Sequence, residues 1–421
     1  MSLGRALLIP GLIAVLAAPQ IAFALSLQEA IALAQRANPI LAQAKARTDA
    51  AEARLAQARA GRLPGLTLFG EAGQGTTDLG GFFGFGHADV SPRAANLELR
   101  QPLFSGGAVS AAIERARQGR DAALAQAGGA KALLAAQAAE AYVAVLAARE
   151  ILALNEAQVR QMGEMARQAQ LQFNGGEISR TDLAQTQARL AEARAALARA
   201  SGDVARTGAH FVTVVGMEPD NLESLPAPPE LPRSLDEAMA TALQTSPALV
   251  AAQAQARAAD AGVRYAKAER LPTLALSATA SSARDQFFPG YRADGVSFGV
   301  QGRWTLFTGG LVSGRIDEAR AGARGAGFGV DSAKAQVREA VVGAWEDVQT
   351  SRVLVEAAAD QETAAASALD SVRNEVRVGQ RPTVDLLDAE RETLSAQSAG
   401  VAARGGAVAA AYRLRALLHG D

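Results

Sequence analysis

The 421-residue sequence contains no cysteine, and this absence excludes several classes of protein at once. Without thiols the chain has no disulfide framework, no thiolate metal site, no cysteine nucleophile and no cysteine to carry a lipid anchor. Histidine is nearly absent too: His87, His210 and His419 lie far apart in the sequence, so a histidine-built site is not expected. We therefore expect no metal and no cofactor.

Aromatic residues and net charge are also scarce. The chain is 49% hydrophobic but only 5% aromatic, because alanine supplies much of its apolar content. Small side chains make thin cores, which argues against large globular domains. The 42 Lys and Arg nearly balance the 43 Asp and Glu, so the basic excess typical of nucleic-acid-binding proteins is missing. No nucleophile with a base and no phosphate-binding loop is recognisable, so we do not predict an enzyme.

The first 24 residues are predicted to be a signal peptide. Arg5 precedes the apolar run over residues 6–18, and Ala22 and Ala24 supply the small residues of a cleavage site. Beyond this segment no stretch holds 18 or more uninterrupted apolar residues, so we expect no membrane-spanning helix in the exported chain. The exported protein is then either soluble or held in a membrane by β-strands.

The rest of the chain is an internal duplication. Residues 26–30 (SLQEA) recur as residues 234–238 (SLDEA), at a spacing of 208. Residues 103–107 (LFSGG) recur as residues 306–310 (LFTGG), at a spacing of 203. Matched landmarks in one order indicate two copies of one structural unit. We assign residues 25–216 to the first repeat, residues 217–232 to a linker, and residues 233–421 to the second repeat.

Each repeat predicts the same series of helices. A short helix begins at Ser26 with a capping box, and a second begins at Pro39 and ends near Arg62. The proline-free run over residues 107–173 is rich in helix formers and predicts a helix about 100 Å long. A returning helix of about 36 residues begins near Thr181. The helix that begins at Pro39 and the returning helix, stacked end to end, match the length of the long one.

Alternation with a period of two predicts four strands, two in each repeat. One face of these strands is apolar, and the other carries Thr, Ser, Glu, Gln and Arg. Four strands cannot close a membrane barrel, so the strands would be shared between chains: a dimer gives eight and a trimer twelve. A soluble hairpin pair packed on helices is the alternative. The predicted strands lie around residues 66–73, 97–100, 273–279 and 296–304.

The duplicated order and the segment 378–389 (VGQRPTVDLLDA) resemble the outer-membrane efflux protein family, the TolC-like channels. The resemblance covers essentially the whole exported chain. It implies a mainly α fold with a small β part, in which duplicated long α-hairpins form an α-helical barrel in the periplasm. It further implies a homotrimer with a 12-stranded transmembrane β-barrel in outer-membrane lipid. Such a channel serves tripartite efflux or type I secretion, together with a periplasmic adaptor and an inner-membrane RND or ABC transporter.

Two aspartates near the start of the last helix are candidate gate residues. Asp385 and Asp388 are three residues apart, so both lie on one face of a helix, and three copies would form two rings that attract cations. Helix-dipole partners near a helix start are the alternative reading. The resemblance implies that Arg381 bonds to Thr181 and Asp182 of the other hairpin and locks the closed gate. Where family members often have a tyrosine, this chain has Val376.

The turns between the long and the returning helices are candidate docking points for the adaptor. The resemblance assigns this role to Gly176 at one tip and to Val378, Gly379, Gln380 and Arg381 at the other. Glycines that simply form turns would give the same pattern, and both readings can hold together. The competing function is a soluble periplasmic coiled-coil scaffold or adaptor, which would share the signal peptide and long helices. The strand pairs favour the channel.

Overall fold

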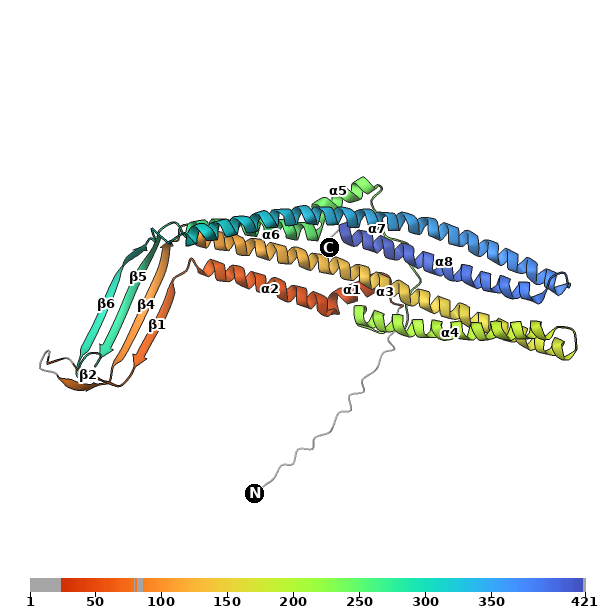
Figure 1. Cartoon of the computed structure of the whole chain (residues 1–421), viewed down its shortest axis with the longest axis horizontal. Coiled ribbons are helices and arrows are strands. Elements are labelled where there is room, and N and C mark those ends of the chain that lie inside the picture. The colour runs from red at the N-terminus through yellow and green to blue at the C-terminus, as the bar shows by residue number, and fades with distance from the viewer. Residues whose placement is uncertain (1–23, 79, 82–85, 419–421) are drawn as a thin grey trace, which may run out of the picture.

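The computed structural model describes residues 24–418, apart from residue 79 and residues 82–85. Residues 1–23 of the predicted signal peptide and His419 lie outside the described residues. Long helices run side by side along most of the molecule, and the main β-sheet is joined to one end of them (Figure 1). The turns between the long and the returning helices lie at the opposite end (Figure 1).

The helices of the two repeats agree in length, one for one. α1 and α5 have 11 residues, α2 and α6 have 22, α3 and α7 have 67, and α4 and α8 have 36. The predicted helix series is therefore present in both halves. The helices are α1 Leu27–Ala37, α2 Pro39–Ala60, α3 Ala108–Asn174, α4 Arg180–Val215, α5 Leu235–Thr245, α6 Pro247–Ala268, α7 Leu311–Arg377 and α8 Thr383–Leu418.

Local sequence signals set the ends of these helices. The Ser26 hydroxyl accepts a hydrogen bond from the Glu29 amide, and the Glu29 carboxylate accepts one from the Ser26 amide, which completes a capping box on α1. The Asn38 side chain caps α2, and Pro39 occupies its first turn, where a missing N–H costs nothing. Gly107 and Gly310 precede the long helices with φ of 87° and 91°, a left-handed conformation that only glycine adopts easily.

The main sheet has four antiparallel strands in the order β1-β4-β5-β6. Its central pair, β4 and β5, joins one repeat to the other. Apolar residues lie opposite each other on one face: Leu66 opposite Leu99, and Leu276 opposite Val300. This apolar face is exposed in the single chain, with Phe298 at 86%. The strands are β1 Gly65–Ala72, β4 Arg93–Phe104, β5 Thr273–Arg284 and β6 Arg292–Arg303.

A second, two-stranded sheet was not predicted from the sequence. β2 Gly75–Asp78 pairs antiparallel with β3 His87–Val90 beyond the outer end of β1 and β4. Each strand has only four residues, too few to show a clear period-two pattern, and the glycines between them favour a loop reading. The four strands predicted from the sequence are therefore those of the main sheet. The described residues also contain this short hairpin.

Helix α3 lies at the centre of the helical wall and contacts α1, α2, α4, α6 and α8. The main cluster of buried residues combines alanines such as Ala138 and Ala139 of α3 with Phe211 of α4. By length and mean hydropathy α3 is the one helix among the described residues that could cross a membrane, which the search for uninterrupted apolar runs had not found. Half of its apolar window is buried inside the protein.

Tyr142 of α3 connects the start of the first repeat to the linker between the repeats. Its fully buried side chain contacts the carbonyl oxygens of Leu25 and Glu223 at 2.8 and 2.9 Å through the hydroxyl. Leu25 and Leu222 form a parallel bridge beside it. Burial, with a smaller contribution from the negative charge of Glu223, raises the pKa of Tyr142 to about 12. The neutral hydroxyl thus fixes the linker on the helical wall.

Close approach of α8 to α3 depends on a glycine. A Cβ atom at Gly405 would lie 2.6 Å from Cγ1 of Val143, whereas one at the neighbouring Gly406 would meet nothing within 4 Å. Real Cβ contacts are not that short, so the two helices would have to separate or Val143 would have to move. Gly405 therefore sets the distance between the second repeat and the first at this level of the wall.

These neighbouring glycines give a matched test of the packing. We expect Gly405→Ala to destabilise the protein by about 1–3 kcal/mol, because overpacking outweighs the gain in helix propensity. Gly406→Ala should stabilise it by up to about 1 kcal/mol, because alanine favours the helix and meets no neighbour. Thermal unfolding followed by helical circular dichroism in detergent measures both. Equal melting temperatures for the two variants would contradict the role of Gly405.

Candidate gate and docking tips

The two hairpin tips lie at the end of the molecule farthest from the sheet (Figure 1) and have the same backbone design. At the first tip the Gly176 amide donates to the carbonyl of Phe173, and at the second the Gly379 amide donates to that of Val376, both at 3.0 Å. Gly176 has φ of 79° and Gly379 has φ of 76°. A residue with Cβ would be strained at either position. The glycines close the last turns of α3 and α7 and reverse the chain.

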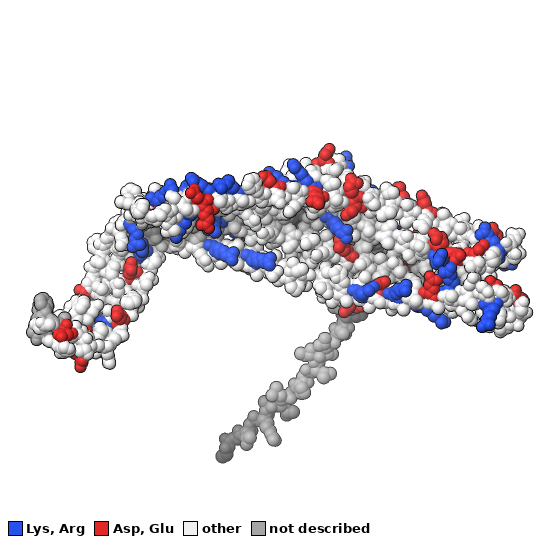
Figure 2. Space-filling view, in the orientation of Figure 1, with Lys and Arg blue, Asp and Glu red and all other residues white. Residues whose placement is uncertain are grey.

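The predicted docking residues are accessible at these tips. Val378 is 67% exposed, and Gly176, Gly379, Gln380 and Arg381 are also exposed. Acidic and basic side chains are interspersed over this end of the molecule (Figure 2). The second tip thus presents the exposed apolar side chain of Val378, with charges of both signs at this end of the molecule.

The two predicted gate aspartates have different partners. The Asp385 carboxylate lies 3.6 Å from a guanidinium nitrogen of Arg381, four residues earlier in the same hairpin. The Asp388 carboxylate accepts a hydrogen bond of 2.8 Å from Arg189, which belongs to α4 in the other hairpin. Asp385 therefore stabilises its own turn, and Asp388 connects the two hairpins of the chain.

Arg381 does not meet Thr181 and Asp182 within the single chain, and the lock that the family resemblance implies stays a prediction. Its guanidinium pairs with Glu375 at 2.6 Å and with Asp385, both in its own hairpin. The Asp182 carboxylate accepts hydrogen bonds from the amide and the hydroxyl of Ser179, at 3.1 and 2.8 Å, in the capping box of α4. Arg381 and Asp182 are thus both engaged within their own hairpins.

Contacts that the sequence reasoning missed lie slightly farther from the tips, both within the second hairpin and between the two hairpins. The Glu390 side chain of α8 is only 4% exposed; it pairs with Arg373 of α7 at 2.9 Å and accepts a hydrogen bond from Gln161 of α3. A small apolar cluster of Met162, Ala193 and Leu387 packs at the same level. Leu387, Glu390 and Thr393 are spaced three residues apart, which places Glu390 on the buried face of α8. This spacing is the feature of the sequence that indicates a buried Glu390.

These contacts can hold the two hairpins of the chain together by electrostatic attraction and by packing. Arg189 and Asp388 are both partly exposed, so their attraction is screened by salt and is worth at most about 1 kcal/mol. Buried Glu390 and the apolar cluster add contacts that would be lost if the hairpins moved apart. Among the residues that the structure describes, no group of His, Cys, Asp and Glu is placed to hold a metal ion.

Comparisons with known proteins place both repeats in one family. The family model described as "Outer membrane efflux protein" matches residues 30–216 and 238–420. Outer membrane efflux protein BepC from Brucella suis is 35% identical over 280 residues, which cover 66% of this chain but only 61% of BepC. Alkaline protease secretion protein AprF from Pseudomonas aeruginosa is 27% identical over 394 residues, which cover 90% of this chain and 81% of AprF.

Solved structures share the fold at low sequence identity. The CmeC outer membrane channel from Campylobacter jejuni matches with a TM-score of 0.83 and 15% identity, over 94% of this chain and 85% of CmeC. This likeness extends to the helical wall and the strands together. The mainly α fold with a small β part is therefore the fold of a known channel.

Asp388 and Asp385 form a natural pair for testing the contact between hairpins. We expect Asp388→Asn to speed hydrogen exchange in α4 and α8 near the tips by up to about fivefold, because the attraction of Arg189 is lost. Asp385→Asn should leave exchange in α4 unchanged, because its partner lies in its own hairpin. Hydrogen exchange with mass spectrometry resolves the two helices. If both variants accelerate α4 equally, the assignment of Asp388 as the connecting residue is wrong.

Proposed function

The chain belongs to the outer membrane efflux protein family, and on that basis we propose that it conducts the substrate of an export system across the outer membrane. It is an outer-membrane protein with a helical wall and a four-stranded sheet. The observation that carries the proposal is the sheet itself, whose apolar face is exposed along Leu66, Leu68, Phe298 and Val300. A soluble coiled-coil scaffold would have to keep that face in water, which is unfavourable.

A homotrimer completes the sheet. The order β1-β4-β5-β6 leaves β1 and β6 as edges in the single chain, and backbone groups at an edge have no water to bond in lipid. Three copies would pair β1 of each chain with β6 of the next and close a 12-stranded barrel. We further propose that residues 25–216 and 233–421 are equivalent wall units, connected by the linker 217–232, with residues 1–24 as a cleaved signal peptide.

The proposed role is passive conduction without catalysis, gated at the tips. Three copies of Asp385 and Asp388 would surround the axis and favour cations. Because Arg381 has no contact with Thr181 and Asp182 inside the chain, the proposed lock between them would have to form between neighbouring copies. The ion pair of Arg189 and Asp388 connects the two hairpins inside each copy. Opening of the gate would either break this ion pair or move both hairpins together.

The proposed partners meet the channel at the tips. A periplasmic adaptor would dock on the exposed turns at Gly176 and over residues 378–381, and an inner-membrane RND or ABC transporter would supply energy and select the substrate. The names of two relatives support export in general: BepC is called an efflux protein, and AprF an alkaline protease secretion protein. Both efflux and type I secretion are consistent with one conduit, because the channel adds no chemistry of its own.

Ion selectivity in planar bilayers tests the channel and its gate together. We expect single channels that prefer potassium over chloride, and Asp385→Asn/Asp388→Asn should lower that preference at least about twofold, because the carboxylate rings are lost. Asp236→Asn/Asp260→Asn removes two exposed charges far from the tips and should leave the preference unchanged. Absence of discrete conductance in the unaltered protein would refute the channel. Equal shifts in both double variants would refute the gate assignment.

Docking at the tips can be tested cleanly because the chain has no cysteine of its own. We expect Glu177→Cys and Gln380→Cys to crosslink to a co-expressed periplasmic adaptor through a thiol–amine reagent, because both side chains are exposed beside the tip glycines. These positions avoid the strain of replacing Gly176 or Gly379. Asp236→Cys on α5 is the matched control, and crosslinking there but at neither tip would contradict the proposed docking.

A further inference from the structure

Both repeats carry a pair of basic residues where the second helix ends and the sheet begins. Arg59 lies in the last turn of α2 and Arg62 just beyond its end, and Lys267 and Arg270 occupy the equivalent positions at the end of α6. All four side chains are exposed, and within the part of the chain that the structure describes none has a carboxylate within 4.0 Å. The neighbouring Glu269 is engaged with Arg315 at 2.8 Å. We call these four residues the basic collar.

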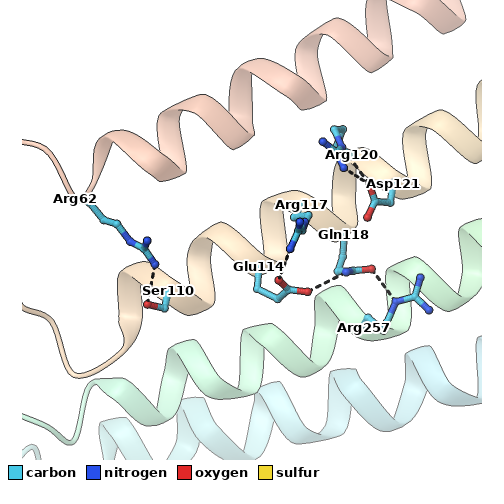
Figure 3. A network of polar contacts seen from close by, with 8 residues as sticks. All are labelled: Arg62, Ser110, Glu114, Arg117, Gln118, Arg120, Asp121 and Arg257. Carbon is cyan, nitrogen blue, oxygen red and sulfur yellow. Dashed lines mark hydrogen bonds and ion pairs between the residues drawn. The ribbon is translucent and has the colours of Figure 1, made fainter.

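The collar is held in place by contacts that occur in both repeats. The Gln101 side chain donates to the carbonyl of Arg62 at 2.9 Å, and the Trp304 ring nitrogen donates to that of Arg270 at 3.1 Å. The guanidinium of Arg62 donates to the Ser110 hydroxyl at 3.1 Å, and that of Arg270 donates to Ser313 at 3.2 Å. Figure 3 shows Arg62 extending across to Ser110 at the start of α3. A guanidinium has five N–H donors, so most remain available to an anion.

The collar lies directly at the end of the apolar face of the sheet. Gln101 and Leu276 lie opposite each other on that face, and Trp304 follows β6 in the same alternation. Leu63, Leu271, Trp304 and Phe307 next to the collar are 63%, 48%, 60% and 87% exposed. Exposed aromatic and leucine side chains followed by unpaired basic residues are the pattern found where a membrane-spanning segment leaves the bilayer.

Helix-end electrostatics account for only half of the collar. Arg59 and Lys267 lie in the last turns of α2 and α6, where a positive charge interacts favourably with the helix dipole. Arg62 and Arg270 lie beyond the helix ends and gain little from it. At the opposite end of the sheet, Arg284 pairs with Asp294 at 2.9 Å.

We propose that the basic collar binds anionic phospholipid headgroups in the periplasmic leaflet of the outer membrane. The proposal rests on the proposed function, because it requires the sheet to lie in the bilayer. The four charges of each chain become twelve in a trimer and form a ring at one depth. Each basic residue near an anionic surface strengthens attraction about fivefold, and the planar guanidinium suits a phosphate oxygen pair. The ring would fix how far the helical wall extends from the membrane.

Trp304 provides a reporter at the collar itself. In a Trp345→Phe background it is the remaining tryptophan of the two in the chain. The full-length protein is reconstituted in phosphatidylethanolamine with either brominated phosphatidylglycerol or brominated phosphatidylethanolamine at equal content. We expect the anionic brominated lipid to quench Trp304 several-fold more effectively, and this preference to shrink at high salt.

Matched double variants then separate the collar from general charge. Arg62→Gln/Arg270→Gln keeps a donor for Ser110 and Ser313 but removes two charges, and it should bring the ratio of quenching by the two lipids close to one. Arg93→Gln/Arg292→Gln removes two exposed charges at the other end of the sheet and should leave it unchanged. Equal quenching by both lipids in the unaltered collar, or equal effects of the two double variants, would overturn the proposal.

Two further arms identify the source of any failure. Soluble glycerol phosphate should compete no better than chloride at equal ionic strength; specific displacement of the brominated lipid would show a site for free phosphate and overturn the lipid assignment. Planar-bilayer conductance is measured on the same preparations. Normal conductance without a preference for anionic lipid would refute the collar alone, whereas absence of conductance in the unaltered protein would refute the channel.

Discussion

The close approach of long helices, made possible by alanine and glycine, is the constraint on which the rest of the structure depends. Helix α3 has five helical neighbours, and residues such as Ala138, Ala139 and Gly405 let them pack without large side chains between them. A wall this thin has no central core, so each helix must be long to bury enough surface. The high apolar content with few aromatics therefore follows from the architecture.

Stability is distributed unevenly along this wall. Near its middle, buried Tyr142 and Phe211 fix the linker and the first repeat together. Toward the tips, the hairpins are connected by partly exposed Arg189 and Asp388, by Glu390 and by a small apolar cluster. Weak polar contacts at one end and a packed middle allow the tips to separate while the rest of the wall stays intact. Glycine forms the turns at the tips without backbone strain, so each turn would move with its helices as a rigid unit.

The helices and main strands could be predicted from the sequence because their causes are local. Capping residues such as Ser26 and Pro39 set helix starts, and period-two alternation marks β4 and β5. The pair of Arg381 with Asp385, four residues apart, is local in the same way. The pair of Arg189 with Asp388 could not be predicted, because these residues lie far apart in the sequence and their contact depends on how α4 and α8 pack. The basic collar was within reach, since Arg59 and Lys267 share the spacing of 208 that revealed the duplication.

The pairing of β4 with β5 governs the order in which the molecule can form. These strands come from different repeats, and Arg93 pairs with Arg284 while Phe104 pairs with Leu274. The α3–α4 hairpin, by contrast, joins neighbouring parts of the chain and can fold early. Closing the sheet must therefore wait until β5 and β6, in the first part of the second repeat, have been synthesised and exported, at a cost in loop-closure entropy. Until then β1 and β4 form a lone hairpin with an exposed apolar face and an unpaired strand edge, which favours aggregation.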